Sequence, residues 1–231
     1  FGGESGGGSY HSIYDSFDHY SRFGDTDFAY GVTLSKVCGR AVLRLANADT
    51  LPFEFTNFAD TIGTYVNEVT RLTDTMREET LVMNKMIESG MLKAVQDPRD
   101  QFVLPAAKGE VPKIDFTPLQ NALKRVQASA DAYQKASAGK TAAGGTQKQL
   151  DEILINTERT LTSSDGLPRR DWFRHQIYAP GFYTGYGVKT LPGVREALEQ
   201  RDWKEAREQI DAAARTLERF AAEIDRAAKL F

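Results

Sequence analysis

The chain has 231 residues, of which 41% are hydrophobic and 26% charged, and these values are typical of a globular protein with a sizeable core. Its formal net charge of −3 argues against nucleic acid as a partner, because phosphate binding requires clustered Lys and Arg. The sequence contains no run of about 18 apolar residues, so it predicts no membrane-spanning helix. The single cysteine, Cys38, excludes an internal disulfide, and its apolar surroundings predict a small buried side chain.

The N-terminal part divides into a loop and a first helix. Residues 1–25 are rich in Gly, Ser, Asp and aromatic residues and predict a loop with at most short structure. The chain opens without an initiator Met or a signal peptide, so we expect an excised or processed piece of a longer protein. From Asp27 a helix is predicted that ends near Pro52, with an apolar stripe formed by Leu34, Val37 or Cys38, Ala41, Leu45 and Ala48.

A long second helix is predicted to follow, with Thr56 or Asn57 as its N-cap. The tripeptide Glu88-Ser89-Gly90 is expected to end or interrupt it. Residues 97–115 contain three prolines and predict an extended connection. The stripe of this helix alternates between spacings of four and three: Phe58, Ile62, Tyr65, Val69, Leu72 and Met76.

Two further helices are predicted in the middle of the chain. Thr117 and Pro118 open the third helix as N-cap and first helical residue. The Gly/Ala/Lys/Thr tract 136–146 predicts a flexible break before the fourth helix. The apolar stripes of the two helices are, in order, Leu119, Leu123, Val126, Ala130 and Tyr133, then Leu150, Ile153, Leu154 and Leu161.

The last helix has the clearest pattern in the chain, because its apolar residues alternate between spacings of three and four without a break. Such a seam favours packing at a shallow angle against other helices. With almost no strand pattern elsewhere, the sequence predicts an all-α protein, a helical bundle of four to five helices. The seam consists of Trp203, Ala206, Ile210, Ala213, Leu217, Phe220, Ile224, Ala227 and Phe231.

Residues 163–192 form a long segment without helical periodicity between the last two predicted helices. Their aromatic content is too high for disorder, so we predict an ordered loop packed on its own bundle or on a neighbouring domain. Within it, Arg169, Arg170, Arg174 and His175 form a basic cluster that is either a solvated loop surface or a contact for an anion or carboxylate. The aromatic residues are Trp172, Phe173, Tyr178, Phe182, Tyr183 and Tyr186.

Motifs for self-contained catalysis are missing from the sequence. The three histidines, His11, His19 and His175, form neither a His-Glu-x-x-His nor a Glu-x-x-His motif. The tract 138–141 resembles the end of a phosphate-binding loop, but Gln134 stands where that motif requires glycine. We therefore predict no catalytic residue in this chain.

Three ordered segments resemble the glutamate carboxypeptidase II family. Residues 9–16, Ser-Tyr-His-Ser-Ile-Tyr-Asp-Ser, are similar to the family's Tyr-His-Ser-Val-Tyr-Glu-Thr. Residues 41–53 resemble its helix that ends in Leu-Ala-Asn and is followed by Leu-Pro-Phe. Residues 174–180, Arg-His-Gln-Ile-Tyr-Ala-Pro, resemble its Arg-His-Val-Ile-Tyr-Ala-Pro loop, and Leu-Pro-Gly at 191–193 resembles its Phe-Pro-Gly.

The resemblance implies that residues 1–25 are the end of an α/β peptidase domain and that residues 26–231 are a helical, transferrin receptor-like dimerisation domain. It makes His11 a ligand of a two-zinc site through a neutral imidazole nitrogen. It also places Tyr10, Arg174 and Tyr186 at the substrate cleft, the last two on a loop formed by residues 174–187. Gly185 precedes Tyr186 where glutamate carboxypeptidase II has Lys, which implies a different substrate preference unless Lys189 takes that place.

The function implied by the resemblance is homodimerisation of a two-zinc exopeptidase. The expected partners are a second copy, the upstream peptidase domain and, in the full-length protein, a peptide substrate. The other zinc ligands and the catalytic glutamate of the family lie upstream, so we expect zinc in the full-length enzyme, none on this fragment, and no activity from the chain alone. Most relatives in the family are exported. The alternatives are a non-catalytic receptor-like homologue and an unrelated helical scaffold.

Overall fold

The computed structural model describes residues 10–94, 99, 103–142 and 144–231, and the chain divides into two units, Phe1–Pro52 and Phe53–Phe231. Ser9 and parts of the predicted 97–115 and 136–146 connections lie outside the described residues. The described fold is helical except for one two-stranded sheet, which confirms the predicted all-α class. Within these ranges no helix combines the length and apolar character needed to cross a membrane.

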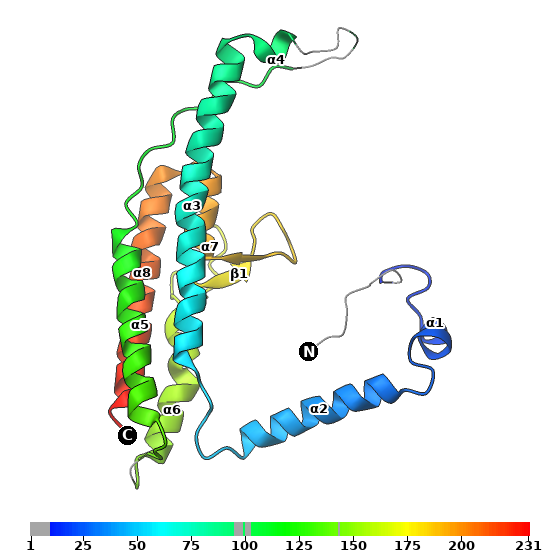
Figure 1. Ribbon diagram of the computed structural model, residues 1–231, viewed down its shortest axis with the longest axis vertical. Helices are drawn as coiled ribbons and strands as arrows, with labels where there is room; N and C mark the ends of the chain where they lie inside the picture. Colours follow the sequence, from blue (N-terminus) through cyan, green and yellow to red (C-terminus); the bar gives the residue numbers. More distant parts are fainter. Residues whose placement is uncertain (1–9, 95–98, 100–102, 143) are drawn as a thin grey trace. The chain divides into compact units, whose positions relative to one another are not determined.

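The first unit contains α1 (Phe17–His19), a π-helical turn (Tyr20–Gly24) and α2 (Ala29–Ala46), drawn in blue in Figure 1. Asp25 organises the start of α2, because its carboxylate accepts hydrogen bonds from the Tyr20 hydroxyl at 2.8 Å, Tyr30 N–H at 3.1 Å and Gly31 N–H at 2.8 Å. These donors hold the pKa of Asp25 below its ordinary value, against the opposing effect of burial.

No residue of α2 is buried. Cys38 is half-buried, so the prediction of a buried cysteine is wrong for the described unit, in which the apolar side of α2 is not covered. The helix pattern itself is correct, because α2 occupies the predicted stretch and ends before Pro52.

The second unit begins with α3 (Phe55–Glu88), which is followed by α4 (Met91–Ala94). The predicted cap at Thr56 or Asn57 is wrong: the helix starts at Phe55, Glu54 is the N-cap residue, and the Asn57 side chain donates a hydrogen bond to the Glu54 carboxylate. Ser89 ends the helix and Gly90 follows in the left-handed region at φ 72°, as Glu88-Ser89-Gly90 predicted.

The inward face of α3 is offset from the predicted stripe. Ile62 and Val69 are fully buried, but the other predicted stripe residues are only half-buried. The helix instead completes its buried face with residues one position away from that stripe, because it packs on several elements at once. These residues are Ala59, Val66 and Thr73, and Phe55 is buried three residues ahead of the stripe.

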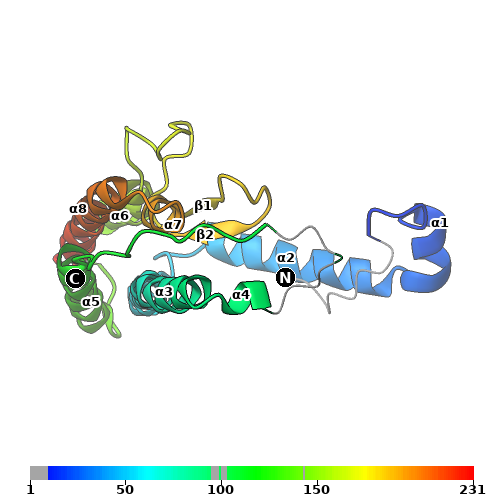
Figure 2. The same cartoon turned by 90° about the horizontal axis from the view of Figure 1, so that it is seen from above.

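Four further helices complete the bundle: α5 (Thr117–Ser137), α6 (Gln147–Thr157), α7 (Pro192–Glu199) and α8 (Trp203–Ala228), with a 3-10 turn (Glu158–Leu161) after α6. α8 packs along α5 and also touches α6 and α7, while α5 packs on α3 (Figures 1 and 2). The sequence did not predict α7 as a separate helix, because eight residues are too few for a clear periodicity.

The core of the bundle lies where α8 faces α5, α6 and α7. The apolar stripes predicted for the last three long helices are largely buried, which confirms them. Phe220 of α8 packs edge-on against Phe58 at 5.4 Å and Phe55 at 6.0 Å between ring centroids. The largest fully buried side chains are Phe220, Ile62, Leu119, Leu150, Leu154, Leu161, Ile177, Leu191, Leu198, Ile210, Leu217 and Ile224.

The start of α5 differs from the prediction by one residue. Thr117 is the first helical residue and Phe116 the N-cap, without a side-chain cap bond. Asp115 takes over the capping task, because its Oδ1 accepts the Thr117 N–H at 2.9 Å. The pKa of Asp115 is lowered by its hydrogen bonds with Thr117.

The long segment 163–192 is packed on its own bundle rather than disordered. It contains the antiparallel strands β1 (Tyr178–Pro180) and β2 (Val188–Thr190), paired as Tyr178↔Thr190 and Pro180↔Val188. Its apolar anchors Leu167, Ile177 and Leu191 are at most 2% exposed. Strands of three residues were not predicted, because they are too short to show alternation.

We expect Phe220→Ala to lower the free energy of unfolding by about 3–5 kcal/mol, because it removes a ring that is 2% exposed and leaves a cavity. Urea unfolding followed by circular dichroism measures the change. Val82→Ala is the control, since Val82 is 57% exposed on α3 and its truncation should cost less than about 0.5 kcal/mol. Equal effects of the two substitutions would contradict the described core.

Candidate functional site

The sequence-predicted site residues lie in both units. Tyr10 and His11 belong to the first unit, and Arg174 and Tyr186 to the second. The two N-terminal residues are neighbours in space as well as in sequence. In the described part of the chain, no hydrogen bond or ring contact joins Arg174 to Tyr186.

Tyr10 and His11 form an exposed turn. Their ring centroids lie 3.9 Å apart with the planes tilted by 48°. His11 has a left-handed backbone with φ 57°, uncommon for a residue other than glycine, and its N–H donates to Asp15 Oδ2 at 3.1 Å. The imidazole is therefore presented to solvent from a turn that a side chain stabilises.

The chemistry of this turn suits zinc only in part. A neutral imidazole is a common zinc ligand, and the His11 side chain is exposed. However, no group of three or more His, Cys, Asp or Glu side chains that could hold a metal ion occurs among the described residues. His11 therefore fits a zinc site as one ligand of a larger set.

A second cluster joins the end of α6 to β1. His175 Nε2 lies 3.2 Å from Glu158 Oε1, and the Tyr178 hydroxyl donates to the same oxygen. The rings of His175 and Tyr178 stack with centroids 4.0 Å apart. The backbone N–H groups of Ile177 and Tyr178 donate to His175 Nδ1 at 3.3 and 3.2 Å, so this nitrogen acts as an acceptor.

The titration of this cluster follows from these contacts. Burial lowers the pKa of His175 and outweighs the opposite effect of Glu158. The Nδ1 atom accepts two N–H groups, and this also favours the neutral ring with its proton on Nε2. The hydrogen bond to Glu158, with burial, raises the pKa of Tyr178 to about 12. The cluster is therefore a neutral His–Tyr pair held by one carboxylate.

The predicted basic cluster makes contacts with carboxylates of the same chain. Arg169 forms a bidentate pair with Glu205 on α8, at 2.7 and 2.8 Å. Arg170 is buried and pairs with Glu196 on α7, with Nη2 3.0 Å from Oε2. Arg174 is exposed, and its carbonyl oxygen accepts Ser163 N–H at 2.9 Å. Arg169 and Arg170 are therefore paired with carboxylates of this chain, and Arg174 lies at its surface.

The residues between the strands, 181–187, form a turn that presents Tyr186. Gly181 N–H donates to the Gly187 carbonyl at 2.8 Å, which closes the turn. Tyr186 is 96% exposed. The ammonium of Lys189 on β2 binds both carboxylate oxygens of Glu199 on α7, at 2.8 and 2.9 Å. Lys189 is therefore paired with a carboxylate of the same chain.

Sequence reasoning missed Glu158 and Glu196, two of the carboxylates that hold this segment. Each lies within or next to a helix, where a Glu is ordinarily a solvated residue. Glu196 is 6% exposed. Its one signal in the sequence is its position among apolar residues in Val194-Arg195-Glu196-Ala197-Leu198.

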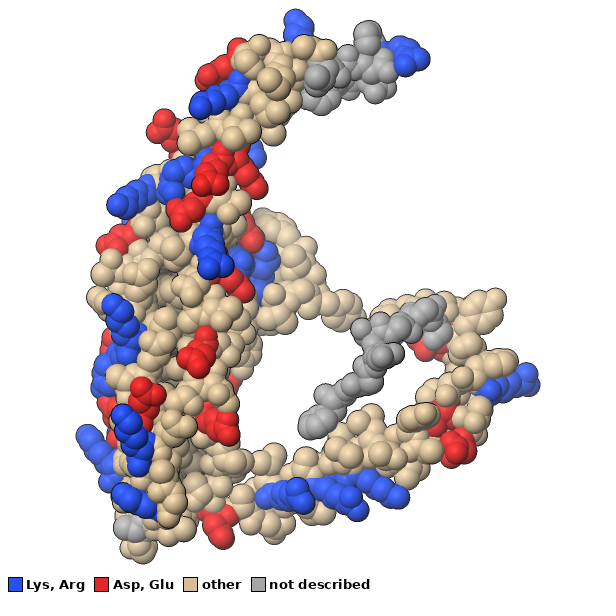
Figure 3. Space-filling model, in the orientation of Figure 1, with Lys and Arg blue, Asp and Glu red and all other residues tan. Residues whose placement is uncertain are grey.

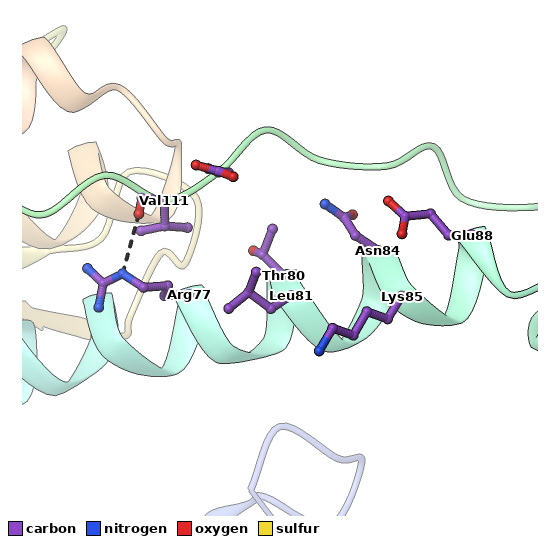
Figure 4. A pocket seen from close by; sticks show the side chains of 8 residues that line it. Arg77, Thr80, Leu81, Asn84, Lys85, Glu88 and Val111 are labelled. Atoms are coloured by element: carbon purple, nitrogen blue, oxygen red, sulfur yellow. Dashed lines mark hydrogen bonds between the residues drawn. The ribbon is translucent and has the colours of Figure 1, made fainter.

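A cavity of about 400 Å³ lies elsewhere, between the second half of α3 and residues 110–111 (Figure 4). Arg77 closes one end, with Nε donating to the Val111 carbonyl at 3.4 Å. Asn84 holds the returning chain through hydrogen bonds with the Lys108 carbonyl at 2.8 Å and N–H at 3.0 Å. These polar contacts attach a connecting segment to α3, and the cavity contains none of the predicted site residues.

We expect His175 to make the stability of the bundle pH-dependent. The unfolded chain takes up this proton near pH 6.5 and the folded chain only at lower pH, so stability is lost as the pH falls below about 6.5. His175→Asn retains an acceptor but cannot titrate, so its urea midpoint should change less between about pH 7.5 and 5.5. His19→Asn, in the other unit, is the control. An unchanged pH dependence in His175→Asn would contradict the assignment.

The comparisons with known proteins agree with this architecture. Residues 114–225, which extend from just before α5 into α8, match the family described as the transferrin receptor-like dimerisation domain. The chain is similar to probable glutamate carboxypeptidase LAMP1 of Arabidopsis thaliana, 28% identical over 215 residues that cover 90% of this chain and 26% of the relative. A probable glutamate carboxypeptidase of Arthroderma benhamiae is 28% identical over 211 residues, 90% of this chain and 24% of the relative.

A Saccharomyces cerevisiae relative, TRE2, whose name includes the words zinc metalloprotease, is 35% identical over 77 residues, 30% of this chain and 10% of the relative. The chain thus spans about a quarter of the length of the two carboxypeptidase relatives. Residues 114–225, just under half of the chain, thus match the transferrin receptor-like dimerisation domain family, and the chain is similar to proteins named as probable glutamate carboxypeptidases.

Proposed function

We propose that this chain is the homodimerisation domain of a two-zinc exopeptidase of the glutamate carboxypeptidase type. In the full-length enzyme it adds one zinc ligand, His11, and a substrate-cleft loop, residues 174–187. The observation that carries the proposal is the match of residues 114–225 to a dimerisation family, on a bundle with its own core. The names of the relatives support the link to a peptidase.

The exposed apolar surface of the first unit supports the inference that another domain covers it. Apolar side chains on α2 are widely exposed, including Tyr30 at 78%, Val42 at 64% and Leu43 at 63%. The helix has no acidic residue, and its three cations, Lys36, Arg40 and Arg44, follow one another at four-residue spacing along one edge (Figure 3). A helix that is apolar around most of its circumference is normally buried in a core. We infer that the upstream peptidase domain covers α2 and leaves the basic edge in solvent.

The proposed chemistry assigns few roles to this chain. Zinc, where bound, polarises the scissile carbonyl and lowers the pKa of a bound water. His11 contributes a neutral imidazole to the ligand set, and Tyr10 borders it. On the cleft loop, Arg174 offers a guanidinium to a substrate carboxylate and Tyr186 a phenol hydroxyl. The remaining ligands and a general base come from the peptidase domain, so the isolated chain is inactive.

Dimerisation predicts a solution mass near twice 25.7 kDa in a light-scattering concentration series of the chain. The exposed apolar side of α2 is a second possible cause of association, so the double variant Val42→Asp, Leu45→Asp is the control. A dimer formed by the bundle persists in this variant, whereas association through α2 is lost. A monomer at all concentrations would contradict self-association of the isolated domain.

The role of His11 is tested in the full-length protein. His11→Ala should lower both bound zinc and peptide hydrolysis, the latter by at least about 100-fold, since even partners of metal ligands cost about 10–100-fold when removed. Metal analysis and initial rates on dipeptides provide the readouts. His19→Ala, from the same unit, should retain both. Full zinc content and activity in His11→Ala would exclude His11 as a ligand, and a wild type without zinc would favour the receptor-like alternative.

A further inference from the structure

The turn 181–187 is attached to the helices by a buried ion pair. Arg170 and Glu196 have side chains that are only 2% and 7% exposed, with Arg170 Nη1 donating to Glu196 Oε1 at 3.1 Å. The second contact, Nη2 to Oε2 at 3.0 Å, is a charge contact without hydrogen-bond geometry, and Arg170 Nε also lacks a partner. Burying two charges is costly, and a hydrophobic pair of similar volume often stabilises as well. Stability alone therefore does not account for this buried pair.

Glu196 connects this pair to the turn. Its Oε1 also accepts the backbone N–H of Phe182 at 2.7 Å. Phe182 lies two residues after the end of β1, at the root of the turn. The Arg170 guanidinium lies 5.7 Å from the centroid of the Phe182 ring and 5.8 Å from that of Phe173. Both the backbone and the ring of Phe182 are thus held by one charge pair.

The rest of the turn is bonded to itself. Besides the Gly181–Gly187 bond, Gly187 N–H donates to the Thr184 carbonyl at 3.2 Å, and Thr184 Oγ1 donates to the Gly187 carbonyl at 3.0 Å. A Cβ at Gly181 would lie 2.1 Å from Thr184 Oγ1, so the root leaves no room for a side chain. A turn with these internal bonds moves as one body. Its direction is therefore set at its root, where Glu196 binds Phe182.

The tip of the turn carries the side chain that the root positions. Tyr186 is 96% exposed, so packing does little to fix its ring, whereas the 77% exposed Tyr183 meets the Phe182 ring edge-on at 4.7 Å between centroids. We propose that Glu196, aligned by Arg170, is a positioning residue that sets the direction of the Tyr186-bearing turn and so the affinity for substrate. This inference rests on the proposed function, in which Tyr186 borders the substrate cleft.

Glu196→Gln tests the inference in two preparations. An amide places a donor where Glu196 Oε2 now faces Arg170, so it cannot satisfy the guanidinium and the Phe182 N–H as the carboxylate does. In this chain, hydrogen exchange of the amides in 181–187 should become at least about 10-fold faster, because a charge-assisted bond is replaced by a weaker one. In the full-length enzyme, KM should rise about 10-fold while kcat changes less than about 3-fold, as expected for lost ground-state binding.

Glu223→Gln is the matched control. It removes the carboxylate of an ion pair within α8, with Arg226, and makes no contact with the root of the turn. Its KM and the exchange of 181–187 should stay at wild-type values. If Glu196→Gln fails to fold because it leaves a buried unpaired charge, the double variant Arg170→Met, Glu196→Gln carries no such charge and replaces it in both measurements.

A Glu196 variant that folds and retains wild-type KM would overturn the inference, and so would equal losses in kcat and kcat/KM. The exchange measurement separates this result from a failure of the proposed function. If the full-length protein hydrolyses no peptide, the proposed function is wrong. Exchange in 181–187 then still decides whether Glu196 positions the turn: unchanged rates refute it, and faster rates support it.

Discussion

The burial of one face of α8 is the constraint on which the second unit depends. The helix has 26 residues and packs against α5, α6 and α7, so its apolar seam is shared by elements from distant parts of the chain. Its polar side is also used, because Arg219 donates to the Thr162 carbonyl at 3.0 Å and Glu205 binds Arg169. The same helix thereby holds the bundle together and fixes the start of the segment that carries the candidate cleft loop.

How much the sequence predicted depends on how many neighbours an element has. α5 and α8 bury one stripe each, and their periodicity was sufficient to identify it. On α3 the buried face is offset, since that helix meets α5, α7 and α8 residues at different points along its length. The N-cap of α3 was wrong because Phe55 is needed in the core, and tertiary packing outweighs a local capping preference. α7 and the two strands were too short for their periodicity to be detected.

The partners of the candidate site residues could be predicted from the sequence even less than the helix faces. Family resemblance selected Tyr10, His11, Arg174 and Tyr186, and the basic cluster suggested carboxylate contacts, but the sequence could not indicate which carboxylates. The partners of Arg169 and Arg170 are 36 and 26 residues away, on α8 and α7. Such pairings depend on the tertiary fold, and local spacing carries no information about them. For Cys38 the sequence predicted too much burial. Apolar neighbours in the sequence lead to a buried side chain only where another part of the structure covers them.

The two units differ in what they require from the rest of a protein. The second buries a continuous set of apolar side chains from α3, α5, α6, α7 and α8, whereas α2 has no buried residue within its own unit. A domain with its own core can present an exposed turn in one orientation if the root of that turn is held by contacts that a small displacement would break. The buried Arg170–Glu196 pair meets this condition, because moving either charge by even a few ångströms leaves the other unpaired in an apolar setting. A buried ion pair can therefore fix the orientation of the turn 181–187, whereas an apolar contact, which is not directional, would only hold the turn against the helices.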